Sequence, residues 1–366
     1  MLQFHYEQKG TEKKRGMGLV VASFHRSGSS SLMQHLSQSG LHAGDELMSG
    51  NKYNPDGYFE DLAPVRFHEA VLKKAGLDWT SMTGTELAMG RKHRAFIKDY
   101  CAKRAARTLN WGFKDPRVCH FLQHWLGIDP TLNALILYRS PVESSWSLYR
   151  RAARELALGL EEDLNSRILR QPDHALALWV VHNRKLLDAR RRFPDRSVVI
   201  SHAGFAAGFN VAAAVRDRFG MELFPADVEQ TFKREIVTQT VEPLPVSNRE
   251  LCAEALDIWN QLQSMDLAKD ARGEARDSEF QDDPSGLLLQ NDLLSSATRY
   301  AREHVRSIEA ELQSARCAGG LPDPTTKAKL IAARTVARKL KRWPFALFFS
   351  RSRKYSTLID EILASD

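Results

Sequence analysis

Cysteine is scarce in this chain, and its spacing excludes several kinds of site. The 366 residues include four cysteines, and no two of them form a C-x-x-C pair. A disulfide-stapled domain, a zinc ribbon and a dithiol redox site all need more closely or regularly spaced cysteines. We therefore expect free thiols in a reducing compartment.

Long apolar runs are also missing. The longest early run, residues 18–24, spans seven residues and ends at a His-Arg pair, and a late run at 343–349 is no longer. A membrane-spanning helix needs about 20 apolar residues, and a signal-peptide core needs about 7–15 with a small-residue cleavage site after it. We expect neither, and a cytoplasmic protein.

Basic charge is concentrated in one segment. The formal net charge is +7, but residues 327–354 hold ten Lys or Arg and no acid, so subtracting those ten leaves −3 on the rest. The overall charge is therefore no argument for nucleic-acid binding, and we expect none. Apolar residues alternate with the basic ones, which is compatible with contact at the inner face of an anionic membrane or with an acidic glycan. A solvated helix packed on its own domain is the alternative.

Apolar patterning predicts an α/β fold. Hydrophobic residues make up 43% of the chain and charged residues 27%, enough apolar side chain for a sizeable core. Short β-branched runs predict buried parallel strands, and apolar residues at helical spacing follow them. A parallel sheet with helices on both faces is the expected architecture. The expected strands are 18–24, 111–114, 132–138 and 197–200, and the clearest helices are 62–76, 91–108, 141–158 and 173–193.

The composition changes after about residue 265. Residues 266–286 are rich in charge, Gly and Ser, which is typical of a linker. We expect a flexible N-terminus over 1–16, a main domain over 17–265, this linker, and a helical extension with the basic tail over 287–366. The long helical pattern at 287–316 is a candidate surface for pairing with a second copy.

The turn after the first strand has the composition of an anion-binding loop. Its residues are His25, Arg26, Ser27, Gly28, Ser29, Ser30 and Ser31. A strand, a Gly/Ser turn and a helix together present backbone N–H groups and a positive helix end, and Arg26 adds a fork of donors for phosphate. The Walker pattern is absent, because Ser29 stands where its lysine would be.

A second motif follows the strand at 132–138. Arg139 lies at the strand end, and Ser147 lies eight residues on, about two turns into the next helix. Both side chains can then hold one phosphate above the sheet edge. Alternatively, Arg139 pairs with Glu143 or caps the helix.

Taken together, these two motifs resemble the sulfotransferases that use 3′-phosphoadenylyl sulfate (PAPS). The segment 54–61 (NPDGYFED) and the segment 112–117 (GFKDPR) resemble N-P-x-G-[YFW]-[FW]-E-[DN] and G-[FW]-K-D-P-R of a largely bacterial branch. The resemblance covers roughly residues 17–202 and implies a P-loop-like three-layer fold. It departs from the family at 201–204 (SHAG), where Tyr-Glu-Asp-Leu is usual, in the lack of a late Gly-rich loop, and at Arg26, where cytosolic enzymes carry Lys.

The resemblance also implies roles for the motif residues. Residues 25–31 would bind the 5′-phosphosulfate, and Arg139 and Ser147 the 3′-phosphate. We expect Arg26, and then Lys114, to balance charge on the leaving phosphate. Glu60 is implied as the base that takes the acceptor proton, with Asp61, Asp45, Glu46 and His68 as alternatives.

No metal is expected. His120 and His124 have the i, i+4 spacing of a metal pair, but aromatic residues flank them, which favours packing.

The predicted reaction transfers a sulfuryl group from PAPS to an alcohol, which we expect to be a carbohydrate or glycan hydroxyl. A P-loop kinase is the alternative enzyme, and a non-catalytic nucleotide-binding or scaffold protein is the alternative from another class.

Overall fold

A four-stranded parallel sheet forms the centre of the protein. This computed structural model describes residues 16–50, 57–82, 84, 86–171, 173–226, 242–271, 279–283, 287–317 and 323–340. The strand order is β2-β1-β3-β4, and the pairing register brings the carboxyl ends of all four strands to one edge. This confirms the predicted α/β class. The strands are β1 (Met17–Ser23), β2 (Asn110–Lys114), β3 (Leu132–Tyr138) and β4 (Ser197–Ser201).

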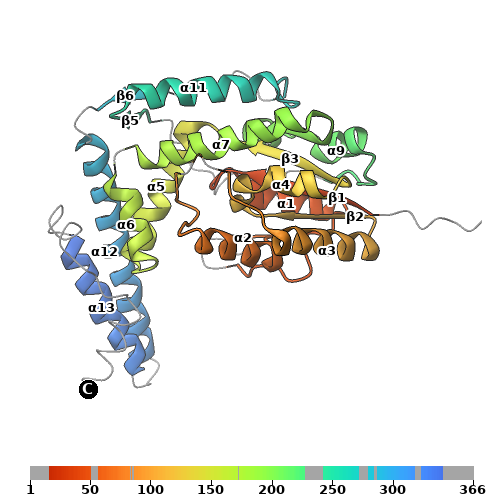
Figure 1. The fold of residues 1–366 in the computed structure, drawn as a ribbon. Coiled ribbons are helices and arrows are strands. Elements are labelled where there is room, and N and C mark those ends of the chain that lie inside the picture. Colours follow the sequence, from red (N-terminus) through yellow and green to blue (C-terminus); the bar gives the residue numbers. More distant parts are fainter. Residues whose placement is uncertain are drawn as a thin grey trace, which may run out of the picture.

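Helices cover both faces of this sheet (Figure 1). The helices with a long apolar pattern begin and end close to their predicted positions. The helices of the main body are α1 (Ser29–Gln38), α2 (Leu62–Lys74), α3 (Arg91–Arg107), α4 (Leu122–Ile128), α5 (Pro141–Ala157), α6 (Glu162–Arg170), α7 (His174–Arg192), α8 (His202–Ala206), α9 (Val211–Phe219) and α11 (Arg249–Ser264), with 3₁₀ turns η1 (Pro116–His120) and η2 (Pro194–Arg196).

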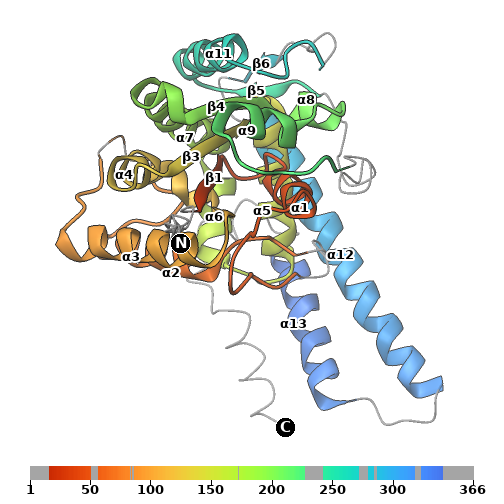
Figure 2. The same ribbon diagram turned by 90° about the vertical axis from the view of Figure 1, so that its right-hand side faces the viewer.

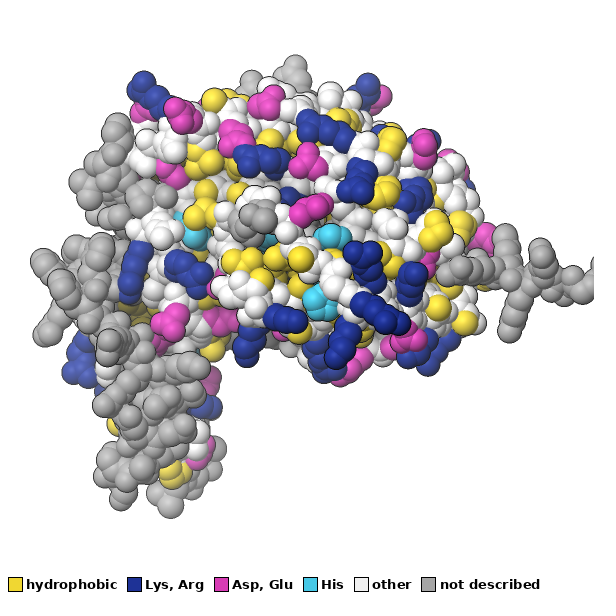
Figure 3. All heavy atoms as spheres, viewed as in Figure 1, with side chains coloured by type: hydrophobic (Ala, Val, Ile, Leu, Met, Phe, Trp, Pro, Cys, Tyr) yellow, Lys and Arg dark blue, Asp and Glu magenta, His cyan; other side chains and the backbone are white. Residues whose placement is uncertain are grey.

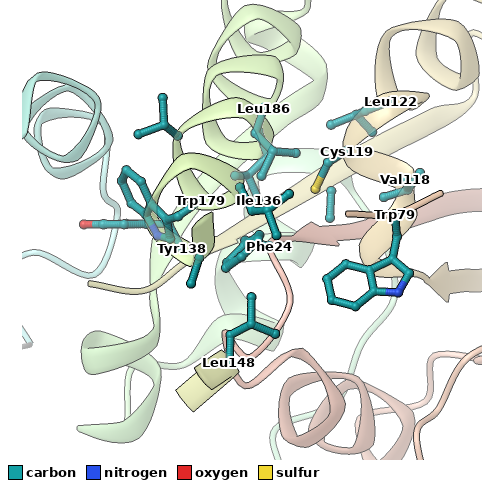
Figure 4. Close-up of a cluster of buried hydrophobic side chains, with 14 of the residues drawn as sticks. Phe24, Trp79, Val118, Cys119, Leu122, Ile136, Tyr138, Leu148, Trp179 and Leu186 are labelled. Carbon is teal, nitrogen blue, oxygen red and sulfur yellow. The ribbon is translucent and has the colours of Figure 1, made fainter. Parts of the chain in front are cut away.

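Alternate residues of β1 point into two different hydrophobic clusters. Leu19 and Val21 pack with α1 and α9, whereas Val20 and Ala22 pack with the helices of the other face. Successive side chains of a strand face opposite ways, so a strand that is apolar at every position is buried on both sides. Phe24, which directly follows β1, lies in the second of these clusters among Ile136, Leu148 and Leu186 (Figure 4).

The order of the strands creates a topological switch point at their carboxyl edge. From β1 the chain passes to β2 on one side, and it then returns to β3 on the other side of β1. Helix α1, which follows β1, packs in one hydrophobic cluster, and α5, which follows β3, packs in the other. Ligands of open α/β sheets bind where neighbouring strands send their helices to opposite faces. The turns after β1 and β3 lie at that point.

Two helices extend from one end of the body as an antiparallel pair (Figure 2). These are α12 (Leu287–Cys317) and α13 (Pro324–Leu340), which share a small cluster around Ile308, Leu312 and Ala333. The first half of α12 packs on α5, and its residues Leu293, Ala297 and Ala301 belong to the main hydrophobic cluster. The apolar residues of the basic tail from 343 onward lie outside the described residues.

A short two-stranded parallel sheet precedes α12. It pairs β5 (Leu244–Val246) with β6 (Phe280–Asp282), and β6 lies within the segment expected to be a linker. Asp266, at the start of the same expected linker, is buried and accepts hydrogen bonds from the Tyr138 hydroxyl and the Ser201 amide, so it ties the chain after α11 to β3 and β4.

Acidic and basic side chains are intermixed over much of the face seen in Figure 3, whereas Lys and Arg side chains gather over the region of α2 and α3. None of the helices in the described ranges combines the length and the apolar character that a bilayer crossing needs.

Candidate active site

The turn between β1 and α1 has the backbone shape of an anion site. Arg26 (φ 66°) and Gly28 (φ 84°) both adopt left-handed conformations on either side of Ser27. Such alternation turns successive N–H groups toward one concave surface, as in phosphate-binding loops. Helix α1 begins there without a side-chain cap, so its first N–H groups also face this surface.

Gly28 is required at its position for two reasons. Its φ lies in the region that L side chains rarely adopt, and an added Cβ would lie 2.5 Å from Cδ2 of His202. The His202 imidazole is buried at the start of α8, after β4. Burial, together with the charge of Arg139, lowers the pKa of His202 to about 3, so this ring is neutral beside the loop.

The second motif meets the first directly. Nε of Arg26 donates to Oγ of Ser147 at 3.0 Å, and Nη1 of Arg139 donates to the backbone carbonyl of Arg26 at 3.2 Å. The Trp179 indole N–H in turn donates to the Arg139 carbonyl at 3.1 Å. The structure therefore brings together two motifs that are more than a hundred residues apart in sequence. Nε of Arg139 also pairs with Glu143 at 3.0 Å, which was the alternative contact.

Lys114 reaches the same loop from the end of β2. This buried lysine donates to Oε1 of Glu60 at 2.7 Å and to Oγ of Ser30 at 3.3 Å. It thus supplies a cation beside the first turn of α1 from a neighbouring strand.

Glu60 lies against two cations. Besides Lys114, Nη1 of Arg117 is 3.7 Å from Oε2 of Glu60, and the carboxylate is 8% exposed. Its backbone carbonyl accepts from the Met48 amide, and Asp61 after it caps α2 by accepting from the Ala63 amide. Glu60 is therefore held beside Lys114 by local structure on both sides.

The alternative carboxylates have other partners. Asp61 accepts from the Tyr100 hydroxyl at 2.9 Å, Asp45 pairs with Arg104 and Arg107, and Glu46 pairs with Arg66. Glu60 is the carboxylate of this group that contacts Lys114.

His68 is locked by its two ring contacts. The Trp125 indole N–H donates to Nε2 of His68 at 2.8 Å, and Nδ1 lies 2.7 Å from Oδ2 of Asp115. Because an indole nitrogen can only donate, Nε2 is the acceptor and Nδ1 carries the proton given to Asp115. Both nitrogens of this buried ring are therefore occupied by partners within the protein.

Asp115 orients Arg117 next to Glu60. Oδ1 of Asp115 accepts from the Arg117 amide and from its guanidinium. Burial acts to raise the pKa of Asp115, but the charge of Arg117 and the hydrogen bond from His68 outweigh it, so the pKa is lowered. The ionised Asp115 in turn raises the pKa of Arg117 against the desolvation of that group. Sequence patterns placed Arg117 in a motif but gave it no role.

His25 faces the core side of the loop. Its buried ring lies 4.1 Å from the Trp79 ring, between centroids, and Nε2 has no hydrogen-bond partner among the described residues. Burial, the neighbouring His182 and two arginines hold the pKa of His25 well below its usual value. The ring is therefore neutral and packs against Trp79, and the role of His25 in phosphate binding stays a prediction.

The serines of the loop occupy different positions. Ser27 is buried with an Oγ that has no partner among the described residues, Ser29 is buried at the start of α1, and Ser30 contacts Lys114. Ser31 is half-buried one residue further. An unpaired buried hydroxyl beside a concave row of N–H groups fits an anionic ligand.

Arg26 is influenced by the positive charge of other arginines. The Arg26 side chain is surface-accessible, yet the protein around it desolvates the guanidinium, and Arg151, Arg154 and Arg139 add positive charge. These effects lower the pKa of Arg26 to about 10, so it remains charged at neutral pH. The sequence could have pointed to Arg151, because it lies four residues after Ser147 in a predicted helix, but the prediction did not include it.

No group of three or more His, Cys, Asp or Glu side chains within the described ranges is arranged to hold a metal ion. His120 pairs with His182 at 3.1 Å and with Lys185 rather than with His124.

Comparison with known protein families finds no match, and no curated protein matches the chain. Among solved structures, the "Sulfotransferase Domain from the Curacin Biosynthetic Pathway" is similar over 79% of this chain and 97% of that domain, at 15% identity and a TM-score of 0.38. A likeness this distant carries no argument about activity.

Proposed function

We propose that this protein transfers a sulfuryl group from PAPS to an acceptor hydroxyl on a carbohydrate. The observation that carries the proposal is the meeting of two anion-binding turns, through Arg26, Ser147 and Arg139, at the carboxyl edge of a parallel sheet. A nucleotide with phosphates on both its 5′ and 3′ positions needs two such sites at a fixed separation. A nucleoside triphosphate needs only one phosphate-binding loop and no second anion site.

The proposed donor sites follow the geometry of the cleft. The N–H groups of the loop and of the first turn of α1 would bind the 5′-phosphate with the hydroxyl of Ser27. Arg139 and Ser147 would bind the 3′-phosphate, and Arg26 lies between the two sites. Binding of a phosphate at Arg139 would compete with its present pair to Glu143.

The reaction forms a bond between the acceptor oxygen and sulfur and breaks the bond between sulfur and the 5′-phosphate oxygen. The electron pair of the broken bond stays on the phosphate, which leaves as adenosine 3′,5′-bisphosphate. Negative charge therefore grows on the leaving oxygen, and preorganised donors lower the barrier there. Because Arg26 is directed to Ser147, Lys114 beside Ser30 is the cation that we now assign first to this leaving oxygen.

Glu60 is the proposed base. It would take the proton of the attacking hydroxyl, which neutralises the carboxylate and ends its ion pair with Lys114. The ammonium group of Lys114 would then be available to the developing charge on the phosphate. Proton removal and charge stabilisation are linked through one 2.7 Å contact.

Nucleotide binding tests the proposal. At 100 times its dissociation constant, a ligand raises the free energy of unfolding by about 2.7 kcal/mol. We expect adenosine 3′,5′-bisphosphate to raise the melting temperature without added metal, and adenosine 5′-monophosphate at equal concentration to raise it less. Stabilisation by ATP that requires magnesium would support the kinase alternative. Stabilisation by none of these nucleotides would contradict a nucleotide-dependent enzyme altogether.

A further inference from the structure

Helix α5 carries positive charge beyond the proposed nucleotide site. Ser147, Arg151 and Arg154 are spaced i, i+4 and i+7, so they share one face of the helix. Arg150 points elsewhere, since its guanidinium lies 5.6 Å from the Trp146 ring centroid and 3.9 Å from Glu242. The Ser147 face of α5 therefore carries two further arginines.

Two of the arginines on this side retain unused donors. Arg26 donates through Nε to Ser147, and Arg151 donates through Nε to Oε1 of Glu155 at 2.7 Å. Each makes no other hydrogen bond to a described residue, so the Nη groups of both remain unpaired within the described part of the protein. The Arg151 side chain is 27% exposed, so water has limited access to its Nη groups and only partly replaces a hydrogen-bond acceptor there. Paired N–H groups in a fixed fork match the oxygens of a carboxylate, sulfate or phosphate.

The position of Arg151 favours the acceptor over the donor. It lies four residues past Ser147, or about 6 Å further along the helix from the strand end. Arg151 thus lies further from the strand end than the serine proposed to bind the 3′-phosphate, on the same face of the helix.

We propose that Arg151, with the added charge of Arg154, binds an acidic group of the acceptor, so that the preferred acceptor is an acidic sugar such as a uronic acid. The proposal rests on the proposed function, because it assumes that an acceptor binds beside Glu60. Glu155 balances one charge of the cluster and orients Arg151 through Nε, while the Asn165 amide supports Glu155 at 3.4 Å. A neutral sugar offers only hydroxyl oxygens, which accept weaker hydrogen bonds from a guanidinium than a carboxylate does and leave its charge unbalanced.

A matched pair of probes tests this. p-Nitrophenyl β-D-glucuronide and p-nitrophenyl β-D-glucoside differ in a carboxylate against a hydroxymethyl group. Each is titrated against the protein saturated with adenosine 3′,5′-bisphosphate, and the dissociation constants are compared. We expect the wild type to bind the glucuronide at least tenfold more tightly, and Arg151→Gln to remove most of that preference. Arg150→Gln, on the same helix, should retain it.

The outcomes separate this inference from the proposed function. Equal affinity for the two glycosides, or binding of neither, by a wild type that binds the bisphosphate would overturn the acidic acceptor alone. A tenfold loss of bisphosphate affinity in Arg151→Gln would also overturn the acidic acceptor, since Arg151 would then belong to the donor site. A wild type that binds no bisphosphate contradicts the proposed function and this inference with it. Unchanged bisphosphate affinity in Arg151→Gln also shows that the variant is folded.

Discussion

Glu60 joins the proposed proton transfer to the proposed charge stabilisation. Replacement by Gln keeps the shape of the side chain but removes its ability to take a proton. We expect Glu60→Gln to bind adenosine 3′,5′-bisphosphate within about threefold of the wild type and to lose about 10²-fold or more in turnover of PAPS. Calorimetry and single-turnover transfer measure the two effects separately.

Glu69→Gln is the control for this substitution. Glu69 pairs with the opposite side of the Arg117 guanidinium at 2.7 Å but is 54% exposed. Because exposed ion pairs contribute little, its turnover should stay within threefold. Turnover of Glu60→Gln within threefold of the wild type would remove Glu60 as the base.

Gly28 carries the backbone conformation on which the loop depends. Gly28→Ala forces an alanine into a positive φ and toward the His202 ring, where Cβ would be 2.5 Å from Cδ2. We expect at least tenfold weaker binding of the bisphosphate and a lower melting temperature. Gly76→Ala is matched to it, because Gly76 also has a positive φ (71°) but has no atom within 4 Å of the added Cβ. Strain alone should lower its stability by about 1 kcal/mol without changing affinity, and equal affinity losses in both variants would contradict this role of Gly28.

For single residues, the sequence predicts which of them lie at the candidate site better than it predicts their contacts. Local patterns identify Gly28 and the residues around it, because a strand, a tight turn and a helix are local. The contact between Arg26 and Ser147 depends on tertiary pairing and turns the arginine toward the second motif. The two ring contacts of His68 are likewise invisible in the sequence, where it remained a candidate base.

At the scale of elements, the strands follow from the pattern because they are apolar at every position. The four predicted strands agree with β1 to β4 within one residue at each end. The expected helices did not include α4, α6 or α11. Helices α4 and α6 run for only about two turns, which is too short for a clear apolar period. Helix α11 is longer, and its buried side chains Ala255, Ile258, Trp259 and Leu262 recur at helical spacing, so the sequence does contain the signal for this helix and the prediction missed it. The packing of α12 on α5 is a tertiary contact that no local pattern contains.

That packing leads to a prediction about stability. Ala297 of α12 is 1% exposed and lies in the main hydrophobic cluster, so Ala297→Glu would bury an unpaired charge. We expect its melting temperature to fall by several degrees or the variant to fail to fold. Ser295→Glu places the same charge two residues away at an exposed position and should leave the melting temperature nearly unchanged. Equal melting temperatures for the two variants would show that α12 is not coupled to the main body.

At the scale of the whole molecule, several histidines are buried in their neutral form. Desolvation comes first in each case and lowers the pKa of His120 to about 2 and those of His182 and His202 to about 3, with His25 shifted in the same direction. In the unfolded chain a histidine has a pKa of about 6.5. At a pH between the native and the unfolded pKa values, the unfolded state binds more protons than the native state. The contribution of these histidines to the free energy of unfolding is therefore fully present above about pH 6.5 and is lost as the pH falls.

Urea unfolding at pH 7.5 and pH 5.5 measures this loss. One pH unit below 6.5, each such histidine removes about 1.4 kcal/mol from the free energy of unfolding. We expect a clear drop for the wild type and a smaller drop for His120→Gln, because one of the titrating groups is gone. His42→Gln changes an exposed histidine and should show the wild-type drop. A wild type equally stable at both pH values would mean that these rings take up protons in the native state. The lowered pKa values of the buried histidines would then be contradicted.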